Sequence, residues 1–311
     1  MKKIKILTSV FLAAAITFSL SACGSGASGE NENTIKIAYL PITHALAVFE
    51  TAEELEQQLG LKVELIKYGS WPELLDALNS DRVDGASVLI ELAMKSKQEG
   101  IGIKAAALGH KDGNVIIVSN DIDSAADLTG KTFAIPHRQS SHNILLNDAL
   151  ASAGLTASDL NITELAPTEM PSALASGQID GYCVAEPFGA KAVSLGAGKV
   201  LFSSEELWED SLCCGLVLTD SYIEEHGDDA KAFVDAYKQA GKNLTADKAK
   251  SIAKKYLNQD DDVLDISLQW ISYDDLEITE ETYNVLIEKV KAYGLSDDPP
   301  SYEDFVLTDF N

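Results

Sequence analysis

Hydrophobic and polar positions in residues 34–121 recur with the periods of strands and of amphipathic helices. Thr34–Pro41 alternates as a strand does and stops at a proline. A helical face follows, with apolar residues from Val48 to Leu59 and with Gly60 at its end. The same patterns predict further strands over 61–69, 81–89, 103–109 and 114–119, and further helices over 70–80 and 90–100. This succession predicts a parallel sheet covered by helices on both faces.

The alternation of strands and helices restarts after residue 121. Ser140 or Ser141 is expected to cap a helix that Gly154 ends, and Ser70–Glu73 predicts a capping box at an earlier helix start. Strands are expected over 131–136, 161–165, 179–187, 199–204 and 213–220, and helices over 124–130, 140–154, 168–178, 228–244, 245–257 and 278–294. The pattern therefore predicts two α/β units and a C-terminal third that is mostly helical.

The first 33 residues have the composition of an export signal and a linker. After a short basic start, Leu7–Leu20 is apolar but only fourteen residues long. A membrane-spanning helix needs roughly 20 apolar residues, so this segment predicts a signal-peptide core. Leu20-Ser21-Ala22-Cys23 resembles a bacterial lipobox, which implies cleavage before Cys23 and a lipid on its sulfur; an ordinary secretory signal with a chance cysteine is the alternative. Residues 23–33 would then be a flexible tether at the extracytoplasmic face of the cell membrane.

Net charge narrows the range of partners. Residues 1–22 hold three of the 24 basic residues and none of the 49 acidic ones, so the remaining 289 residues carry a net charge of −28. Such a charge disfavours nucleic acid and anionic lipid as partners. The length suits two domains. We expect a monomer that reaches the membrane only through its lipid.

The cysteines beyond Cys23 do not form a recognisable framework. They are Cys183, Cys213 and Cys214, an odd number that does not suggest paired disulfides. The neighbours Cys213 and Cys214 are expected to be two small buried side chains, with a vicinal disulfide as the alternative. No CxxC or HExxH spacing predicts a metal site, and no GxSxG or Walker loop predicts catalysis. We therefore expect no cofactor and no enzyme activity.

Three segments resemble a family of transport proteins. They are LLDALNSDRVDGASV, DLTGKTFAIPHRQSSHNILLNDALASAGL and LAPTEMPSALASGQIDGYCVAEPFGAKA. They resemble the solute-binding proteins of ABC importers for nitrate, sulfonates, taurine and thiamine precursors, the NitT/TauT or NMT1/THI5-like group. The resemblance covers about residues 34–221 well and the remainder loosely.

That resemblance implies an α/β chain with a type II periplasmic-binding-protein fold, two α/β domains joined by a two-crossover hinge. Domain 1 would comprise 34–121 and 217–311, and domain 2 would comprise 122–216. A small solute would bind between them and pass to the transmembrane permease. Because THI5-like relatives include a pyrimidine synthase, an enzyme is the alternative class, although export argues against it. A ligand-sensing subunit of a receptor is a third possibility.

In this architecture a ligand lies against the carboxyl ends of strands and the amino ends of helices. Segment 137–143 suits an anion, because a helix start offers free N–H groups and Arg138 offers a bidentate fork; a plain helix cap is the alternative. An oxyanion such as nitrate, bicarbonate or a sulfonate would fit there, whereas His44, Tyr68 and Trp71 would equally suit a thiamine-pyrimidine-like ring. The candidate binding residues are Thr43, His44, Tyr68, Trp71, Ser87, Arg138, Ser140, Ser141, His142 and Glu186. His110 and His226 are expected to be solvated loop residues.

Overall fold

The computed structural model describes residues 34–308. The predicted signal segment, Cys23 and the tether fall within 1–33 and lie outside the described residues. Among residues 34–308, no helix combines the length and the apolar character needed to cross a bilayer.

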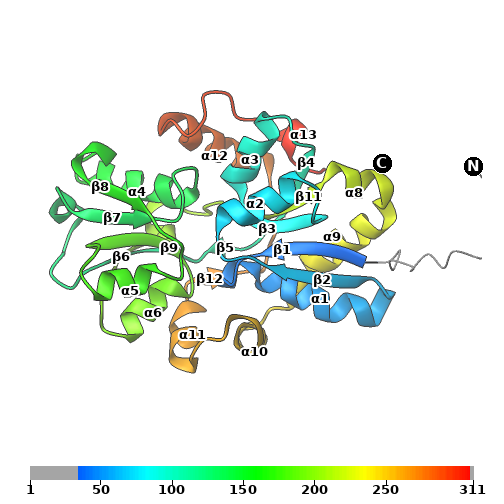
Figure 1. Ribbon diagram of the computed structural model, residues 1–311, viewed down its shortest axis with the longest axis horizontal. Coiled ribbons are helices and arrows are strands. Elements are labelled where there is room, and N and C mark those ends of the chain that lie inside the picture. Colours follow the sequence, from blue (N-terminus) through cyan, green and yellow to red (C-terminus); the bar gives the residue numbers. More distant parts are fainter. Residues whose placement is uncertain (1–33, 309–311) are drawn as a thin grey trace, which may run out of the picture. The chain divides into compact units, whose positions relative to one another are not determined.

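The first lobe is built on a five-stranded sheet with the order β2-β1-β3-β11-β4 (Figure 1). Strand β1 pairs in parallel with β2 and β3, whereas β11 runs antiparallel to β3 and β4. The strands are β1 (Thr34–Tyr39), β2 (Lys62–Lys67), β3 (Gly85–Leu89), β4 (Ile103–Leu108) and β11 (Cys214–Thr219). The helices of this lobe are η1 (Thr43–Ala45), α1 (Leu46–Leu59), α2 (Trp71–Asn79), α3 (Ile90–Gln98), α8 (Asp220–Glu225) and α9 (Gly227–Asn243).

The second lobe is built on another five-stranded sheet, with the order β10-β6-β9-β7-β8. Strand β7 is parallel to β8 and β9, and β6 is antiparallel to β9 and β10. The strands are β6 (Asn114–Val118), β7 (Thr132–Ile135), β8 (Asn161–Glu164), β9 (Gly181–Ala185) and β10 (Lys199–Ser203). The helices are η2 (Ala125–Leu128), α4 (Ser141–Ser152), η3 (Ala157–Asp159), α5 (Met170–Ala175), α6 (Phe188–Ser194) and α7 (Ser204–Leu207).

The expectation of purely parallel sheets was wrong. Each sheet contains a strand that arrives from the other lobe, β11 in the first and β6 in the second. Such a strand begins beside the carboxyl ends of the parallel strands, so it runs antiparallel to them. Because β6 and α7 belong to the second lobe, we propose that the two crossovers lie at 109–113 and 208–213. The first crossover then ends eight residues before the boundary expected at 121.

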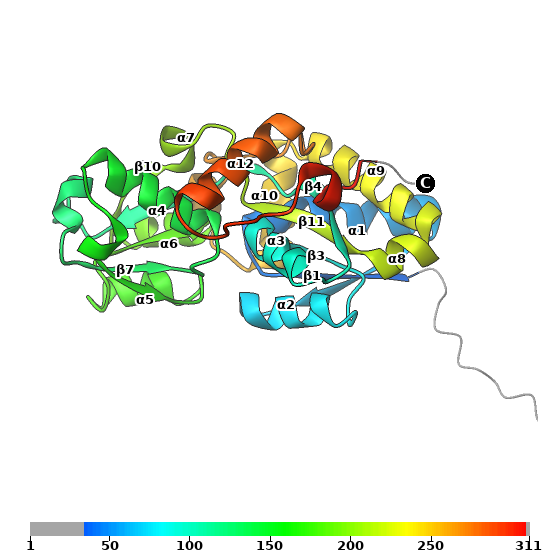
Figure 2. The same cartoon turned by 90° about the horizontal axis from the view of Figure 1, so that it is seen from above.

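The C-terminal segments pack against both lobes. They comprise α10 (Ala246–Leu257), α11 (Asp261–Ser267), β12 (Ile271–Ser272), α12 (Glu280–Ala292) and α13 (Tyr302–Phe305), with β12 pairing with β5 (Lys111–Asp112) of the first crossover. On the second lobe, Lys191 of α6 pairs with Asp260 at 3.1 Å. Asp148 of α4 pairs with Lys289 of α12 at 2.8 Å, and Figure 2 shows α12 reaching toward α4. These segments therefore connect the two lobes beyond the crossovers themselves.

The helix boundaries follow local sequence signals in most cases. Gly60 ends α1 in the left-handed region with φ of 66°, as expected. Ser140 is the N-cap of α4, since its hydroxyl accepts the Asn143 N–H at 3.3 Å. The capping box predicted at Ser70–Glu73 was wrong, because α2 begins at Trp71 as expected but the Ser70 side chain makes no capping bond.

Candidate functional site

Four side chains that are typical metal or hydrogen-bonding ligands meet at the ends of the first-sheet strands. Their potential ligand atoms all lie within 4.8 Å of one another. We call these residues the buried cluster, because each is 0% exposed; they are His44, His110, Cys213 and Cys214. No similar group of histidine, cysteine or acidic residues, buried or exposed, is found elsewhere in residues 34–308.

The first-sheet topology brings these residues together. His44 lies in η1 directly after β1, and His110 follows β4. Cys214 begins β11, which lies beside β4, and Cys213 directly precedes that strand. The Gly109 N–H donates to the Cys214 carbonyl at 2.7 Å, which ties the end of β4 to the cysteine pair. A side chain at Gly109 would meet the His44 carbonyl at 2.8 Å, so only glycine fits this close approach.

The distances inside the buried cluster are short. His44 Nδ1 lies 3.4 Å from Cys214 Sγ and 3.7 Å from Cys213 Sγ, and the two sulfurs are 3.8 Å apart. The rings of His44 and His110 are neighbours, with centroids 3.5 Å apart and planes tilted by 32°. On its other side, His44 Nε2 is 2.9 Å from the Gly113 carbonyl. A carbonyl only accepts, so Nε2 carries the proton and Nδ1 presents its lone pair to the sulfurs.

Further buried polar groups surround the buried cluster without partners. Glu91 is the second residue of α3, and His142 is the second residue of α4 in the second lobe. Among the described residues no hydrogen-bond partner is found for the ring nitrogens of His110 and His142, the carboxyl oxygens of Glu91 or the hydroxyl of Ser141. Each buried group left unpaired costs about 1–3 kcal/mol. Such a concentration of unpaired groups indicates a place that a ligand completes.

Burial sets the charge of these groups. It lowers the pKa of His110 and of His142 to about 4, with His44 adding to the effect in both cases. Burial, together with the nearby Cys213, raises the pKa of Glu91 well above its usual range. At neutral pH both of these imidazoles are therefore neutral, and burial favours the protonated form of Glu91. The site offers neutral donors and acceptors rather than a positive charge.

The two cysteines differ in their electrostatics. Burial alone would raise the pKa of Cys213, but the hydrogen bond from Cys214 and the nearby His142 and His44 outweigh it, so this pKa lies well below its usual value. Burial and the neighbouring Cys213 raise the pKa of Cys214 well above its usual value. Both thiols are free. Of the two cysteines, Cys213 is therefore the first to form a thiolate as pH rises.

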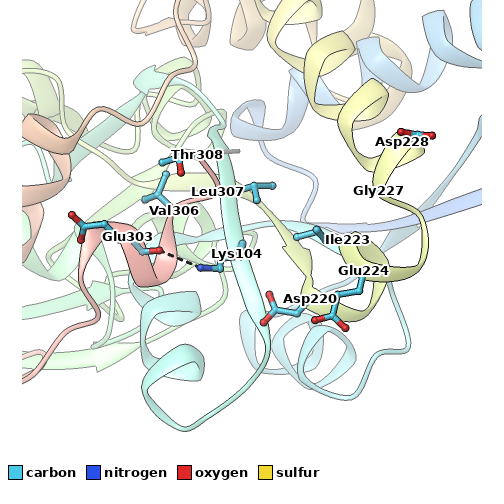
Figure 3. Close-up of a pocket in the computed structure, with 10 residues that line it drawn as sticks. All are labelled: Lys104, Asp220, Ile223, Glu224, Gly227, Asp228, Glu303, Val306, Leu307 and Thr308. Carbon is cyan, nitrogen blue, oxygen red and sulfur yellow. Dashed lines mark hydrogen bonds between the residues drawn. The ribbon is translucent and has the colours of Figure 1, made fainter. Parts of the chain in front are cut away.

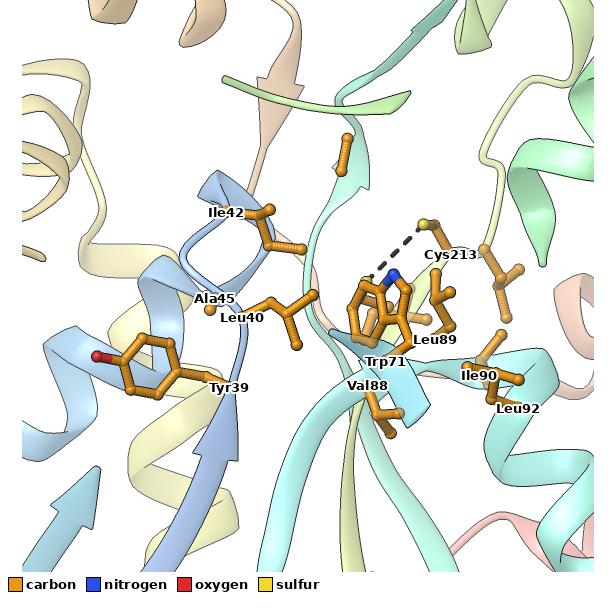
Figure 4. Packing of buried hydrophobic residues seen from close by; sticks show 14 of the residues in the cluster. Tyr39, Leu40, Ile42, Ala45, Trp71, Val88, Leu89, Ile90, Leu92 and Cys213 are labelled. Carbon is orange, nitrogen blue, oxygen red and sulfur yellow. Dashed lines mark hydrogen bonds between the residues drawn. The ribbon is translucent and has the colours of Figure 1, made fainter. Parts of the chain in front are cut away.

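Several predicted residues lie in or beside this site. His44 belongs to the buried cluster, and Ser141 and His142 face it from the second lobe through their proximity to Cys213 and Glu91. Trp71 is buried among apolar residues of the core that also includes Cys213 (Figure 4), and its Nε1–H has no hydrogen-bond partner among the described residues. Ser87 on β3 is buried, and its hydroxyl is likewise unpaired within residues 34–308.

Thr43 and Glu186 join the lobes instead. The Thr43 amide and hydroxyl both donate to the Glu186 carbonyl, at 2.8 and 2.9 Å. The Glu186 carboxyl accepts the Ala190 N–H of the following helix, α6, at 3.2 Å. Tyr68 is half-buried beside β2.

Arg138 and Ser140 do not reach the buried cluster. Arg138 is exposed, and its guanidinium donates to the Ile162 carbonyl on β8, the edge strand, at 3.1 Å. The Ser140 hydroxyl donates to the His137 carbonyl at 2.5 Å and accepts from Asn143 as a helix cap. The start of α4 thus has two parts. Arg138 and Ser140 bond to nearby backbone groups, whereas Ser141 and His142 are directed to the site.

Two residues of the site were not anticipated. The prediction that His110 is a solvated loop residue was wrong, since it is fully buried; His226 is half-buried against Tyr222. Glu91 was not singled out, because a glutamate in the first turn of a helix is common on surfaces. The sequence has no metal-ligand spacing, but this absence did not exclude a cluster of such ligands. The four residues of the buried cluster come from three segments that are far apart in the sequence. The signal that could have revealed them is that each lies at a predicted strand end.

A separate hollow of about 700 Å³ lies at the edge of the first lobe (Figure 3). Its lining includes several acidic side chains, among them Asp220, Glu224 and Glu303, and Lys104 donates to the Glu303 carbonyl at 3.3 Å. None of its lining residues carries a buried polar atom without a partner. We therefore place the functional site at the buried cluster and not here.

Two α/β lobes joined by two crossovers, with unpaired polar side chains buried where the lobes meet, define a two-lobe solute-binding protein of the periplasmic-binding-protein type. Residues 28–258 match the family model described as NMT1-like family, and the chain belongs to this family. The predicted family and fold class are therefore confirmed.

Individual relatives agree with this assignment. A solved structure from Staphylococcus aureus is 42% identical, covers 89% of this chain and 97% of its own, and superposes with a TM-score of 0.85. It is described as the ligand-binding component of an ABC-type import system with zinc bound. A putative aliphatic sulfonates-binding protein of Bacillus subtilis is 28% identical over 240 residues, 73% of this chain and 70% of that protein.

The nitrate import ATP-binding protein NrtC of Synechocystis is 29% identical over 206 residues, 59% of this chain. The matched part is only 31% of NrtC, so the chain corresponds to about a third of that protein. The Staphylococcus aureus and Bacillus subtilis relatives, which match over most of their length, are described as binding components, so the prediction that this chain is not an enzyme is confirmed.

Proposed function

We propose that this chain is the lipid-anchored, extracytoplasmic solute-binding component of an ABC importer. It captures a small solute between its lobes at the buried cluster and presents the closed form to a transmembrane permease. The observation that carries the proposal is the concentration of unpaired buried polar groups, from both lobes, in a fold of this class. Solute contacts from both lobes would shift the hinge toward the closed state.

An oxyanion solute has limited support at this site. The Bacillus subtilis and Synechocystis relatives are described in terms of sulfonates and nitrate. However, no lysine or arginine is buried among the described residues, and Arg138 is bonded to β8. Ser141 and Trp71 still offer neutral donors, and the neighbouring rings of His44 and His110 could adjoin a thiamine-pyrimidine-like ring. The zinc of the Staphylococcus aureus relative brings metal ions into the set of solutes to be compared.

A thermal-shift screen over nitrate, bicarbonate, alkanesulfonates, pyrimidines and Zn²⁺ tests solute binding. A solute at 100 times its dissociation constant adds about 2.7 kcal/mol to the unfolding free energy. Small-angle scattering should then show a smaller radius of gyration with that solute. Cells that carry a variant defective in solute binding, at normal abundance, should lose uptake of the same solute. Unchanged uptake would contradict the importer function, and chemical conversion of the solute would support the enzyme alternative.

The lipid anchor is supported by the lipobox-like sequence before Cys23. Replacing Cys23 by alanine should release the protein into the medium or leave it unprocessed, because the sulfur that carries the lipid is gone. Cell fractionation and the mass of the mature N-terminus measure this outcome. Since Cys183 lies in the folded body, Cys183→Ala is the matched control and should remain in the membrane fraction. A Cys23→Ala protein that is still membrane-bound and processed would contradict the anchor.

A further inference from the structure

We propose that the solute held at the buried cluster is a thiophilic transition-metal ion of the Zn²⁺ class. The proposal rests on the importer function above and names the solute class of the same site. The ligands would be His44, His110, Cys213 and Cys214. Two cysteine sulfurs and two histidine nitrogens form one of the ligand sets that four-coordinate zinc takes in proteins, and thiolates select soft over hard cations.

The separations of the potential ligand atoms suit one tetrahedral ion. Zinc–sulfur bonds of about 2.3 Å and zinc–nitrogen bonds of about 2.0 Å place two sulfurs about 3.8 Å apart and a sulfur and a nitrogen about 3.6 Å apart. Here the sulfurs of Cys213 and Cys214 are 3.8 Å apart. His44 Nδ1 lies 3.4 and 3.7 Å from them. Three ligands therefore already stand at the spacing of a shared ion, and His110 lies within the same 4.8 Å group.

The surroundings of His44 are those of a metal ligand. A histidine that binds a metal through one ring nitrogen usually donates the other N–H to a carbonyl or carboxylate, which fixes the ring. His44 Nε2 donates to the Gly113 carbonyl at 2.9 Å, so Nδ1 is free to bind on the side of the sulfurs. The His110 ring lies next to the His44 ring, with centroids 3.5 Å apart, and neither of its nitrogens has a hydrogen-bond partner among the described residues. One of them would gain its partner from the ion.

Charge balance favours a divalent cation in this enclosed place. Two thiolates and two neutral imidazoles carry a charge of −2, which a divalent ion neutralises, so the occupied site would bury no net charge. An isolated buried charge is costly, and a coordinated set of opposite charge removes that cost. An oxyanion in the same place would have no buried lysine or arginine to pair with, because none is buried among the described residues.

The origin of the ligands suggests a transported ion and not a permanent structural one. All four come from the first lobe and its crossovers, whereas His142 and Ser141 approach from the second lobe with unpaired polar atoms. An ion bound on the first lobe would gain contacts from the second lobe only when the lobes meet. Such a difference in contacts between open and closed states is what drives closure.

Metal titration of the purified full-length chain tests the ligand set. The protein is stripped with a chelator, kept reduced with a phosphine, and titrated with Co²⁺ and then Zn²⁺. We expect one ion per chain, a thiolate-to-cobalt absorption band, and its loss when Zn²⁺ displaces Co²⁺. Cys213→Ala and Cys214→Ala should each weaken zinc binding by more than about 100-fold, beyond the effect of outer-shell changes. Wild-type protein that binds no stoichiometric ion would overturn the proposal.

A matched control and a second substitution keep the result interpretable. Cys183 is a free, fully buried cysteine on β9 outside the buried cluster, so Cys183→Ala should bind zinc like the wild type. Equal zinc affinity in all three alanine variants would overturn the proposal. If Cys213→Ala does not fold in the presence of chelator, Cys213→Ser, which keeps a similar volume, takes its place and should show the same weakening.

Scattering and uptake separate this inference from the importer function. Zn²⁺ should reduce the radius of gyration of the wild type but not of Cys214→Ala. Binding through both cysteines without compaction would make the ion structural and overturn its role as solute. If another solute compacts the protein and is taken up while Zn²⁺ does neither, the importer function stands and this inference falls. If Zn²⁺ binds and compacts the protein but its uptake does not depend on the chain, the importer function falls instead.

Discussion

At the scale of single residues, the orientation of His44 depends on backbone atoms far away in the sequence. Its Nε2–H is held by the Gly113 carbonyl of the first crossover, and the backbone amide of its neighbour Thr43 is held by Glu186 of the second lobe. The ring orientation therefore depends on the two lobes being in contact. Side chains at the site and the hinge are coupled through this short segment.

Glu186 provides a pH test of the lobe contact. Burial raises its pKa from 4.5 to about 8, although the Ala190 N–H opposes the shift. The folded chain thus keeps a proton that the unfolded chain loses as pH rises above about 4.5, so this group lowers the unfolding free energy between about pH 4.5 and 8. Below this range both states are protonated, and above it the penalty is constant.

We therefore predict that Glu186→Gln removes this pH dependence. Glutamine has the same shape and does not titrate. The wild type should lose a few kcal/mol of unfolding free energy relative to the variant from pH 5 to pH 8, at up to about 1.4 kcal/mol per pH unit. Denaturant titrations of both proteins at several pH values measure the difference, in which all shared groups cancel. Parallel curves would show that Glu186 is ionised in the folded state.

Sequence reasoning identified part of the site at this scale. His44, Ser141 and His142 follow from their places after a strand or at a helix start, and the structure brings them to the buried cluster. His110 could not be placed in the same way, because its burial depends on the crossover that covers it. Arg138 was chosen for its charge, but a carbonyl on the neighbouring strand holds its guanidinium. Local hydrogen bonds of this kind are invisible in a single sequence.

At the scale of elements, strand and helix positions were predictable, whereas strand directions were not. Alternating apolar residues located β1, whereas β3 and β9 were located as short runs of small and apolar residues and are buried along their whole length. The directions of β6 and β11 depend on which lobe the preceding segment belongs to, and this is a tertiary property. The same crossovers place Cys213 and Cys214 beside His44, so the predicted elements alone could not assemble the site.

The start of α4 permits a comparison of two neighbouring side chains. His142 faces the site with unpaired ring nitrogens, whereas Arg138 lies outside the site and donates to the Ile162 carbonyl of β8. We predict that His142→Ala weakens binding of the solute found by screening roughly 5- to 150-fold, the loss of about 1–3 kcal/mol for one hydrogen bond or ligand contact. Arg138→Ala should change affinity by less than about twofold. Calorimetric titration of the folded variants measures both.

The opposite result would restore the anion site expected from sequence. A large loss in Arg138→Ala with no loss in His142→Ala would mean that the solute binds along the outer part of segment 137–143. The N-cap bond of Ser140 is untouched in both variants, so α4 should keep its start. Circular dichroism of the two proteins checks that condition.

At the scale of the whole described chain, contacts from the C-terminal segments help to hold the lobes together. Asp148 of the second lobe accepts from Lys289 of α12 at 2.8 Å and from the Tyr293 hydroxyl at 2.5 Å. The side chains of Lys289 and Asp148 are only 22% and 14% exposed, so solvent screens this pair less than a surface ion pair. On the other side, Lys191 and Ser194 of α6 bind Asp260 and Asp262. Two sets of contacts therefore hold the lobes together in this structure without any solute, one at Asp148 and one at α6.

We predict that Asp148→Asn shifts the chain toward an open state. The substitution removes the charge that Lys289 pairs with, at a cost of about 1–2 kcal/mol for a charged hydrogen bond in a partly buried place. The radius of gyration without solute should rise, and solute affinity should fall about 5- to 30-fold, because apparent affinity scales with the closed fraction. Asp235→Asn, in the exposed Lys231–Asp235 pair within α9, is the control and should change neither quantity. Asp148 does not belong to the buried cluster. A loss of solute affinity with an unchanged radius of gyration would therefore contradict the role of the Asp148–Lys289 contact in holding the lobes together, and would point to a local disturbance of α4.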